Sequence, residues 1–258
     1  MSTAQSIDPS VTQATLAENF LKYFEVGLAT TSSQIDSALR IRYDVYCEEF
    51  GYEPAENFPD KKEYDEYDDH SIHCLITHKS SGMPAGCVRL ITTSDEEHRD
   101  LLPFEKVCRN ILNEELVSEL GLERETMCEV SRLTVHSAFR RRAGEGFTRY
   151  GKVSAADCRC QEQQAFELIA VANFLATMAV TVLTGRINVF ALMGSYLPRL
   201  LSRSGIVYKK VGEDIVYHGR RSPYFGRTQP TLDNMRPGLK DLYNAIYDKI
   251  NQSFVESR

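Results

Sequence analysis

The 258-residue chain has no tryptophan, no cysteine pair spaced Cys-x-x-Cys and no excess of positive charge. Its net charge of −6 provides no general attraction to nucleic acid, so we expect no nucleic-acid partner. Its seven cysteines are an odd number, and five of them stand among apolar residues, as reduced buried thiols do. These features indicate a reducing compartment and predict a cytoplasmic protein.

The N-terminal residues lack the basic and then apolar order of a secretory signal peptide, and we expect residues 1–18 to form a mobile tail. Residues 165–184 are apolar over about the length that spans a bilayer. They include Glu167 and Asn173, and no asymmetry of basic residues flanks them. A buried core helix is therefore favoured over a transmembrane span, while peripheral contact with a membrane remains open.

The hydrophobic pattern predicts an α/β (α+β) fold, with a mixed central sheet flanked by helices. Helical spacing predicts helices at 33–50, at 100–120 with a break at Pro103, at 165–185 and at 196–204. Alternation predicts strands at 71–78, 85–92, 127–136 and 187–193, and a last strand pair at 206–210 and 215–218. We expect one domain over residues 19–230, followed by an amphipathic helix within 231–258.

Charged residues occur where apolar ones are expected. Arg42 lies on the inward stripe of the first predicted helix, where a guanidinium needs an anion unless its stem reaches solvent. Glu63, Asp65 and Asp68 lie in a loop, here called the acidic loop, directly before the predicted strand at 71–78. The three carboxylates repel one another unless cations offset their charge or the loop is solvated. Arg42 and Arg89, the latter inside an apolar strand, are the candidate cations.

The third predicted strand carries Glu129, Ser131 and Arg132. Alternation places Glu129 and Ser131 on one face and Arg132 on the other. A carboxylate on an apolar strand has a raised pKa unless it is paired, which suits a general acid or base; a structural salt bridge is the alternative. His70 and His73 stand near the acidic loop, but their spacing matches no zinc motif and the arginines would repel a cation, so we predict no metal.

These residues form an ordered series of motifs. The series is Arg42-x-x-x-Tyr46, Gly51-Tyr52, Glu63-x-Asp65-x-x-Asp68, Gly86-Cys87-Val88-Arg89-Leu90 and Glu129-x-Ser131-Arg132. In this order it resembles the LuxI-type acyl-homoserine-lactone synthases, which have the GNAT acyl-CoA N-acyltransferase fold. The chain looks closest to two side branches, the long-chain N-acyl amino acid synthases and the acyltransferases associated with PEP-CTERM/exosortase systems. Residues 43–50 and Pro223-Tyr224-Phe225 are similar to the second branch.

The resemblance implies an acyltransferase that moves a fatty acyl group from a thioester to the α-amine of a small acceptor such as an amino acid. It favours acyl carrier protein over coenzyme A as the donor's carrier, and it implies no permanently bound cofactor. The lactone synthases usually carry Phe and Trp where this chain has Tyr46 and Tyr52, so S-adenosylmethionine is kept as an alternative acceptor. Two further hypotheses are a non-catalytic protein that binds an acyl chain or small molecule, and an acyltransferase that modifies a protein lysine.

The resemblance also implies roles for individual residues. Glu129 is the expected base, Asp65 would orient the ammonium, and backbone N–H groups from Ser131 onward would meet the oxyanion. Arg132 would bind the acceptor carboxylate or support the acidic loop. The other residues expected to shape the acceptor site are Arg42, Tyr46, Tyr52, Glu63, Asp68 and Arg89.

The donor's pyrophosphate would meet an R-x-x-G-x-G turn made by Arg141, Arg142, Gly144 and Gly146. A surface for an acidic carrier protein would use basic residues on both sides of the apolar helix. These are Arg140, Arg141, Arg142, Arg149, Lys152, Arg199, Arg203, Lys209 and Lys210. The acceptor, the acyl chain length, the oligomeric state and the pathway stay open at this stage.

Overall fold

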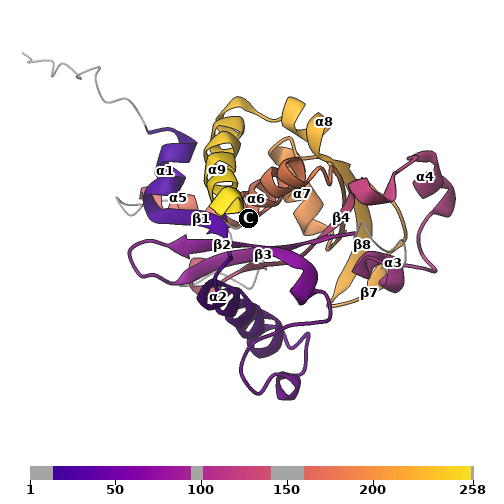
Figure 1. Ribbon diagram of the computed structural model, residues 1–258, viewed down its shortest axis with the longest axis horizontal. Coiled ribbons are helices and arrows are strands. Elements are labelled where there is room, and N and C mark those ends of the chain that lie inside the picture. The colour runs from indigo at the N-terminus through magenta and orange to yellow at the C-terminus, as the bar shows by residue number, and fades with distance from the viewer. Residues whose placement is uncertain (1–13, 94–100, 141–159, 257–258) are drawn as a thin grey trace, which may run out of the picture.

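The structure, a computed structural model, describes residues 14–93, 101–140 and 160–256. A mixed sheet runs through the molecule, with the strand order β1-β2-β3-β4-β5-β8-β6 and with β7 paired to β8 (Figure 1). The strands are β1 (Phe24–Leu28), β2 (Ser71–His78), β3 (Pro84–Thr92), β4 (Met127–Val135), β5 (Asn188–Met193), β6 (Lys209–Lys210), β7 (Ile215–Val216) and β8 (Arg220–Arg227). β4 and β5 are parallel, and the other pairs are antiparallel.

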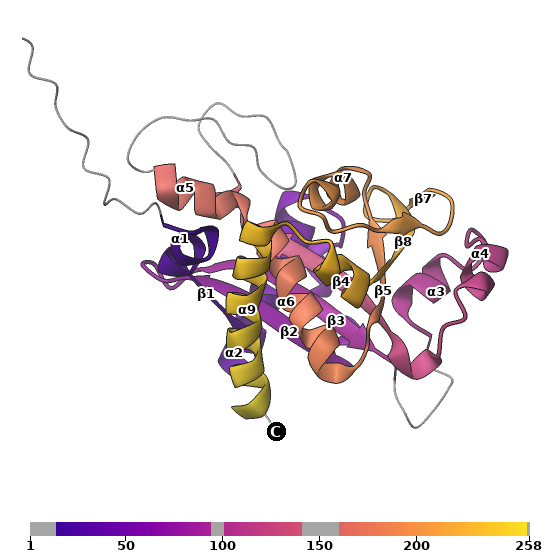
Figure 2. The same cartoon turned by 90° about the horizontal axis from the view of Figure 1, so that it is seen from above.

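Helices cover both faces of the sheet. α2 (Ser32–Tyr43) lies on one face, while α1 (Leu16–Tyr23), α6 (Ile169–Thr184) and α9 (Pro237–Glu256) lie on the other (Figure 1). α6 and α9 run side by side over the strands, as Figure 2 shows from above. The remaining helices are α3 (Pro103–Val107), α4 (Glu114–Glu119), α5 (Cys160–Glu167), α7 (Tyr196–Arg203) and α8 (Thr228–Asp233).

The apolar run predicted as a core helix is confirmed in that role. Residues 169–181 of α6 are all buried, and the helix ends at Gly185, whose φ of 72° suits glycine. None of the helices in the described ranges is both long and apolar enough to cross a membrane. α9 packs on α6 and β1 and contributes to the same core, so the predicted C-terminal helix is part of the domain.

The elements before residue 110 differ from the predictions at several points, and the strand β1 was not predicted at all. α1 begins at Leu16 behind a capping box between Thr15 and Glu18, so the end of the expected tail is helical. α2 continues as a π-helical turn, Asp44–Glu49, instead of ending as one α-helix at residue 50. Pro103 begins α3 and does not break a helix, because the first turn needs no N–H from this residue.

The predicted pairing of the last two strands is wrong. β6 and β7 each pair with β8, which also pairs with β5 along its length. β8 was missed because it contains Pro223, which cannot donate to a ladder and usually marks an edge strand. Here the carbonyl of Pro223 accepts a hydrogen bond from the Val211 N–H at 2.9 Å, so β8 still bonds to the neighbouring backbone at this position.

Two irregularities in β4 position the site. The parallel ladder with β5 spans three pairs, from Met127↔Asn188 to Glu129↔Phe190, after which no further pair joins the two described strands. The register between β3 and β4 also shifts between Cys87 and Arg89, and Arg132 has a φ of 53° there. A bulge therefore turns β4 at the point where it leaves β5.

The fold predicts a tight constraint at Gly86, where β3 meets α6. A Cβ atom at this position would lie 2.7 Å from Ile169 Cγ2 and 2.9 Å from Asn173 Nδ2. We expect Gly86→Ala to lower the free energy of unfolding by about 1–3 kcal/mol through overpacking. Urea denaturation measures this, with Gly238→Ala as control because a Cβ at Gly238 would meet no atom within 4 Å. Equal loss in both variants, or none in either, contradicts the prediction.

Candidate active site

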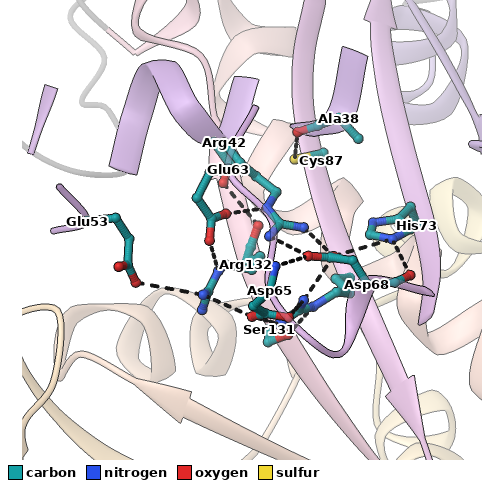
Figure 3. A network of polar contacts seen from close by, with 12 residues as sticks. Ala38, Arg42, Glu53, Glu63, Asp65, Asp68, His73, Cys87, Ser131 and Arg132 are labelled. Carbon is teal, nitrogen blue, oxygen red and sulfur yellow. Dashed lines mark hydrogen bonds and ion pairs between the residues drawn. The ribbon is translucent and has the colours of Figure 1, made fainter. Parts of the chain in front are cut away.

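Three arginines and three carboxylates form a closed ring of ion pairs on the face of the sheet that α2 covers (Figure 3). In order around the ring they are Arg42, Glu63, Arg132, Asp65, Arg89 and Asp68. Each arginine contacts two of the carboxylates, and each carboxylate contacts two of the arginines. The six formal charges therefore cancel within the ring.

Arg42 confirms the prediction of an inward arginine on the first helix. Its side chain is 1% exposed, and its Nε lies 2.5 Å from Glu63 Oε2. Its Nη1 and Nη2 donate to the two oxygens of Asp68 at 2.6 and 3.0 Å. A guanidinium bound on both edges is oriented as well as neutralised.

Arg132 does not point to the face predicted for it. Its Nε donates to Glu63 Oε1 and its Nη2 to Asp65 Oδ2, both at 3.0 Å. The prediction assumed unbroken alternation, and the bulge with a positive φ at Arg132 turns this side chain towards the acidic loop. Of the two roles expected for Arg132, these contacts favour support of the loop over binding of an acceptor.

Asp65 is held by two arginines through its two carboxylate oxygens. Its Oδ1 lies 2.5 Å from Arg89 Nη1 and also accepts the Tyr67 N–H at 2.9 Å. Its Oδ2 lies 2.9 Å from Arg89 Nη2 and 3.0 Å from Arg132 Nη2. Both oxygens thus serve the ring and the Tyr67 N–H, and the expected role of Asp65 in orienting the acceptor's ammonium stays a prediction.

The ring stays ionised although it is buried. Burial by itself raises the pKa of Glu63, Asp65 and Asp68, but the neighbouring guanidinium groups lower the pKa of all three below the ordinary range. Burial opposes the charge of Arg42 and Arg132 as well, and the carboxylates more than offset it and raise their pKa. The charges therefore persist at neutral pH.

His73, one of the two histidines considered as metal ligands, lies buried beside this ring. Its Nε2 lies 3.5 Å from Asp68 Oδ1, and burial lowers its pKa. Within the described residues no group of three or more His, Cys, Asp or Glu side chains has the arrangement of a metal site. The cysteines Cys47, Cys74, Cys87, Cys108 and Cys128 are free and buried, as predicted.

A cavity of about 470 Å³ opens beside the ring, where β4 and β5 diverge. It passes through the sheet, because its wall includes Tyr46 on the α2 side and Phe174 of α6 on the other side. Of the predicted site residues, the wall contains Tyr46, Asp65, Arg89, Glu129, Ser131 and Arg132. Arg42, Glu63 and Asp68 stand outside it and support it through the ring, and Tyr52 packs its ring against Tyr46 at 5.9 Å.

Glu129 is the one buried acid among the described wall residues that lies outside the ring. Its side chain is 3% exposed, and its Oε2 accepts the Phe104 N–H at 2.7 Å. Burial raises its pKa to about 8, although the Phe104 N–H, Arg89 and Arg132 all act to lower it. A carboxyl with such a pKa gains or loses a proton close to neutral pH, which is the property expected of a general acid or base.

Glu53 and Arg221 are among the wall residues that the sequence analysis missed. Glu53 follows the Gly51-Tyr52 motif, and its Oε1 lies 2.7 Å from His218 Nε2. Burial raises the pKa of Glu53. Arg221 enters the wall from β8, the strand that was not predicted, so no periodic signal was available to place it. For Glu53, its position directly after the Gly51-Tyr52 motif was the signal that could have marked it as a site residue.

The predicted donor turn lies outside the described residues, namely Arg141, Arg142, Gly144 and Gly146, and so do Arg149 and Lys152. Arg140 is described and is wrong as a surface docking residue, because it is buried against Glu49 and the Val135 carbonyl. Four of the other basic residues are exposed, as a docking surface requires: Arg199, Arg203, Lys209 and Lys210. Docking itself stays a prediction.

Comparison with known proteins supports the fold and the class of enzyme. Residues 41–148 match the family described as acetyltransferase (GNAT) domain. FeeM, an N-acyl amino acid synthase from uncultured soil microbes, is 12% identical with a TM-score of 0.54, over 84% of this chain and 97% of its own. BjaI, a CoA-dependent acyl-homoserine lactone synthase in complex with SAM and isopentyl-CoA, is 16% identical with a TM-score of 0.51, over 87% and 89%.

A third structure, TofI in a ternary complex with an inhibitor and MTA, is 20% identical with a TM-score of 0.55, over 84% of this chain and 99% of its own. No curated protein sequence gives a significant match. The predicted GNAT-like fold is confirmed, and the matched domain is that of an acyltransferase, as predicted. Placement in the PEP-CTERM/exosortase branch stays a prediction.

The ring predicts a steep loss of stability when one member is removed. We expect Arg42→Ala to lower the free energy of unfolding by about 3–5 kcal/mol, because Glu63 and Asp68 then lose a buried partner. Lys62→Ala, which removes the 2.7 Å pair with Asp36 on the surface, is the control and should cost less than about 1 kcal/mol. Chemical denaturation of the two variants decides; similar small losses would mean that the ring is not cooperative.

Proposed function

We propose that this protein transfers a fatty acyl group from an acyl thioester to the amine of a small acceptor, with Glu129 as the proton acceptor. The observation that carries the proposal is Glu129 itself, a buried carboxyl with a pKa of about 8 in the wall of the cavity. An ammonium group must lose a proton before its nitrogen attacks a thioester. A protein that merely binds acyl chains has no use for such a group.

The divergence of β4 from β5 supports the same reaction. Beyond Glu129, the β5-facing edge of β4 has no ladder partner in the described residues of β5, so backbone N–H groups from Ser131 onward are available to the cavity. Fixed N–H dipoles of this kind stabilise the oxyanion that forms when the amine adds to the carbonyl. Ser131 accepts a hydrogen bond from Arg89 Nε at 3.0 Å, which gives it a positioning role in this scheme.

The apolar part of the wall suits the acyl chain. Phe104, Phe174 and Leu197 line it, and they come from α3, α6 and α7, so three helices enclose the same space. The thioester would stand between this apolar part and Glu129. We favour acyl carrier protein over coenzyme A as the carrier, because Arg199, Arg203, Lys209 and Lys210 are exposed basic residues and carrier proteins are acidic.

The acceptor is proposed to be an amino acid, with S-adenosylmethionine as the alternative. FeeM, the N-acyl amino acid synthase, and BjaI, whose structure holds SAM, represent the two choices on one fold. An assay of the purified protein tests these choices. It combines an acylated carrier protein or acyl-coenzyme A as the donor with an amino acid or S-adenosylmethionine as the acceptor. Release of thiol together with an N-acyl product in the mass spectrum supports the function; thiol release without an amide product contradicts it.

Replacing the proposed base tests the mechanism. We expect Glu129→Gln to lower kcat by about 100-fold or more, because the amide cannot take the proton. The Gln carbonyl oxygen can still accept the Phe104 N–H, so the local fold is retained. Steady-state kinetics at saturating donor and acceptor measures the loss. Ser222→Ala, which removes a hydroxyl bound to Asp214 at 2.6 Å, is the control and should keep kcat; full activity of Glu129→Gln removes Glu129 from the base role.

Glu129→Gln, which should lower kcat, should raise the stability of the protein at pH 8. The pKa of Glu129 is about 8 in the folded protein against an ordinary value of 4.5, so the folded chain binds more protons between these two pH values. Stability contributed by this site is therefore present below pH 4.5 and is lost as pH rises to 8. We expect the melting temperature of Glu129→Gln to be higher than that of the wild type at pH 8 and equal to it at pH 4. Equal melting temperatures at pH 8 would show an unperturbed carboxyl.

A further inference from the structure

The hairpin between β7 and β8 has a strained turn. β7 is two residues long and joins β8 through two pairs, and the turn consists of residues 217–219. Within it the Tyr217 N–H donates to the Gly219 carbonyl at 2.9 Å, and His218 has a φ of 49°. A residue other than glycine seldom adopts a positive φ, and it keeps that conformation where its surroundings hold it. Because so short a strand pair contributes little stability, contacts outside the hairpin must hold the turn.

His218 is fixed by residues from the N-terminal part of the chain. Its Nε2 lies 2.7 Å from Glu53 Oε1, and its side chain is 9% exposed. The centre of its ring lies 5.6 Å from that of Tyr52 and 5.7 Å from that of Tyr46. A Cβ atom at Gly219 would lie 3.8 Å from Tyr52 Oη, so the backbone of the turn is close to the same tyrosine. Glu53 and the two tyrosines thus hold the turn in place.

The contact between Glu53 and His218 lies at the rim of the cavity. Tyr217 is part of the cavity wall, while Val216, the residue before it, is 86% exposed to solvent. Glu53 belongs to the wall on the other side of the contact, and its side chain is 25% exposed. The chain thus passes from solvent to the cavity within two residues. The contact therefore joins two sides of the rim at a place where the cavity meets solvent.

The two sides of the rim are anchored differently. On one side the Glu53 N–H donates to the Tyr46 carbonyl at 3.3 Å, and Glu53 Oε1 lies 3.9 Å from Arg132 Nη2 of the ring (Figure 3). On the other side the bond from Arg221 Nε to the His218 carbonyl, at 3.2 Å, stays within the hairpin. Glu53 is thus tied to the body of the domain, whereas the turn moves with its own short hairpin. The turn is therefore the side of the rim that can move.

We propose that residues 217–219 form a latch on the cavity, which is closed while His218 binds Glu53 and opens when that contact breaks, so that a ligand can enter or leave. The moving part is the turn together with β7, and β8 stays fixed by its ladder with β5. Lids hinged at a few backbone positions control access to sites in this way. The inference rests on the geometry of the cavity and applies to any ligand that binds there, so it goes beyond the proposed function.

A thiol placed in the cavity wall measures access to the cavity. Ala191→Cys, at a buried wall position on β5, is introduced into every protein that is compared. The rate of alkylation by iodoacetamide is followed by mass spectrometry on the peptide that contains position 191, which separates the introduced thiol from the native ones. We expect Glu53→Ala and His218→Asn each to raise this rate about 5-fold or more, because the latch loses its closing contact. Asparagine tolerates a positive φ, so His218→Asn adds no strain to the turn.

Glu56 supplies a matched control, because it is an exposed carboxylate three residues from Glu53. Glu56→Ala removes the same charge and should leave the alkylation rate unchanged. Glu53→Gln keeps an oxygen that can accept the His218 Nε2–H, so its rate should lie between those of Glu53→Ala and the intact latch. In the double variant of Glu53→Ala and His218→Asn the rate should equal that of either single variant, because both substitutions break one contact.

Hydrogen exchange followed by mass spectrometry detects the opening itself. We expect Glu53→Ala to speed exchange in the peptide of residues 214–221 and to leave exchange in β5 and α6 unchanged.

Three outcomes overturn the inference. The alkylation rates of Glu53→Ala and His218→Asn equal that of Glu56→Ala, the effects of the two substitutions multiply in the double variant, or exchange becomes faster in β5 and α6 as well as in the hairpin. The last result would mean that the whole domain has loosened. Neither measurement requires a substrate or turnover, so the latch and the proposed function stand or fall separately.

Discussion

The closed ring of three guanidinium groups and three carboxylates is the constraint on which the site depends. It connects four parts of the chain, namely α2, β3, β4 and the acidic loop that precedes β2. In its most buried pair, the side chains of Arg42 and Glu63 are each 1% exposed. Buried charges are tolerated when each one has partners that match its geometry. Six groups that satisfy one another in a cycle meet that condition jointly, so the loop has one stable position relative to the strands.

The neutrality of the ring also sets the chemistry of its neighbour. A net positive cluster next to Glu129 would hold its carboxyl ionised at low pH, and a net negative one would keep it protonated throughout the physiological range. A balanced ring leaves burial as the dominant influence, and the pKa of Glu129 comes to about 8. The group can then change its protonation state near neutral pH, so the balance of the ring bears on the proton transfer that we propose for it.

The sequence predicts the parts of the site that follow from periodicity and charge. Arg42 on an apolar stripe, a carboxylate within an apolar strand, and three acids in need of cations are all local signals, and the structure brings these residues together. The direction of Arg132 was beyond such signals, because one residue with φ of 53° reverses the alternation of its strand. Arg221 could not be placed because it lies on β8, which contains Pro223 and was therefore not predicted as a strand. β8 forms through its pairing with β5, a long-range contact that the local sequence does not show.

The short parallel ladder between β4 and β5 has a consequence for how the chain folds. β1 to β4 join through antiparallel neighbours, and β5 to β8 form a second antiparallel group, so each group forms largely from nearer contacts. The three pairs from Met127↔Asn188 to Glu129↔Phe190 join the two groups across a long stretch of chain. The cavity takes wall residues from both groups, so it is complete only when the groups are docked, whereas all six members of the ring belong to the part of the chain that ends with β4.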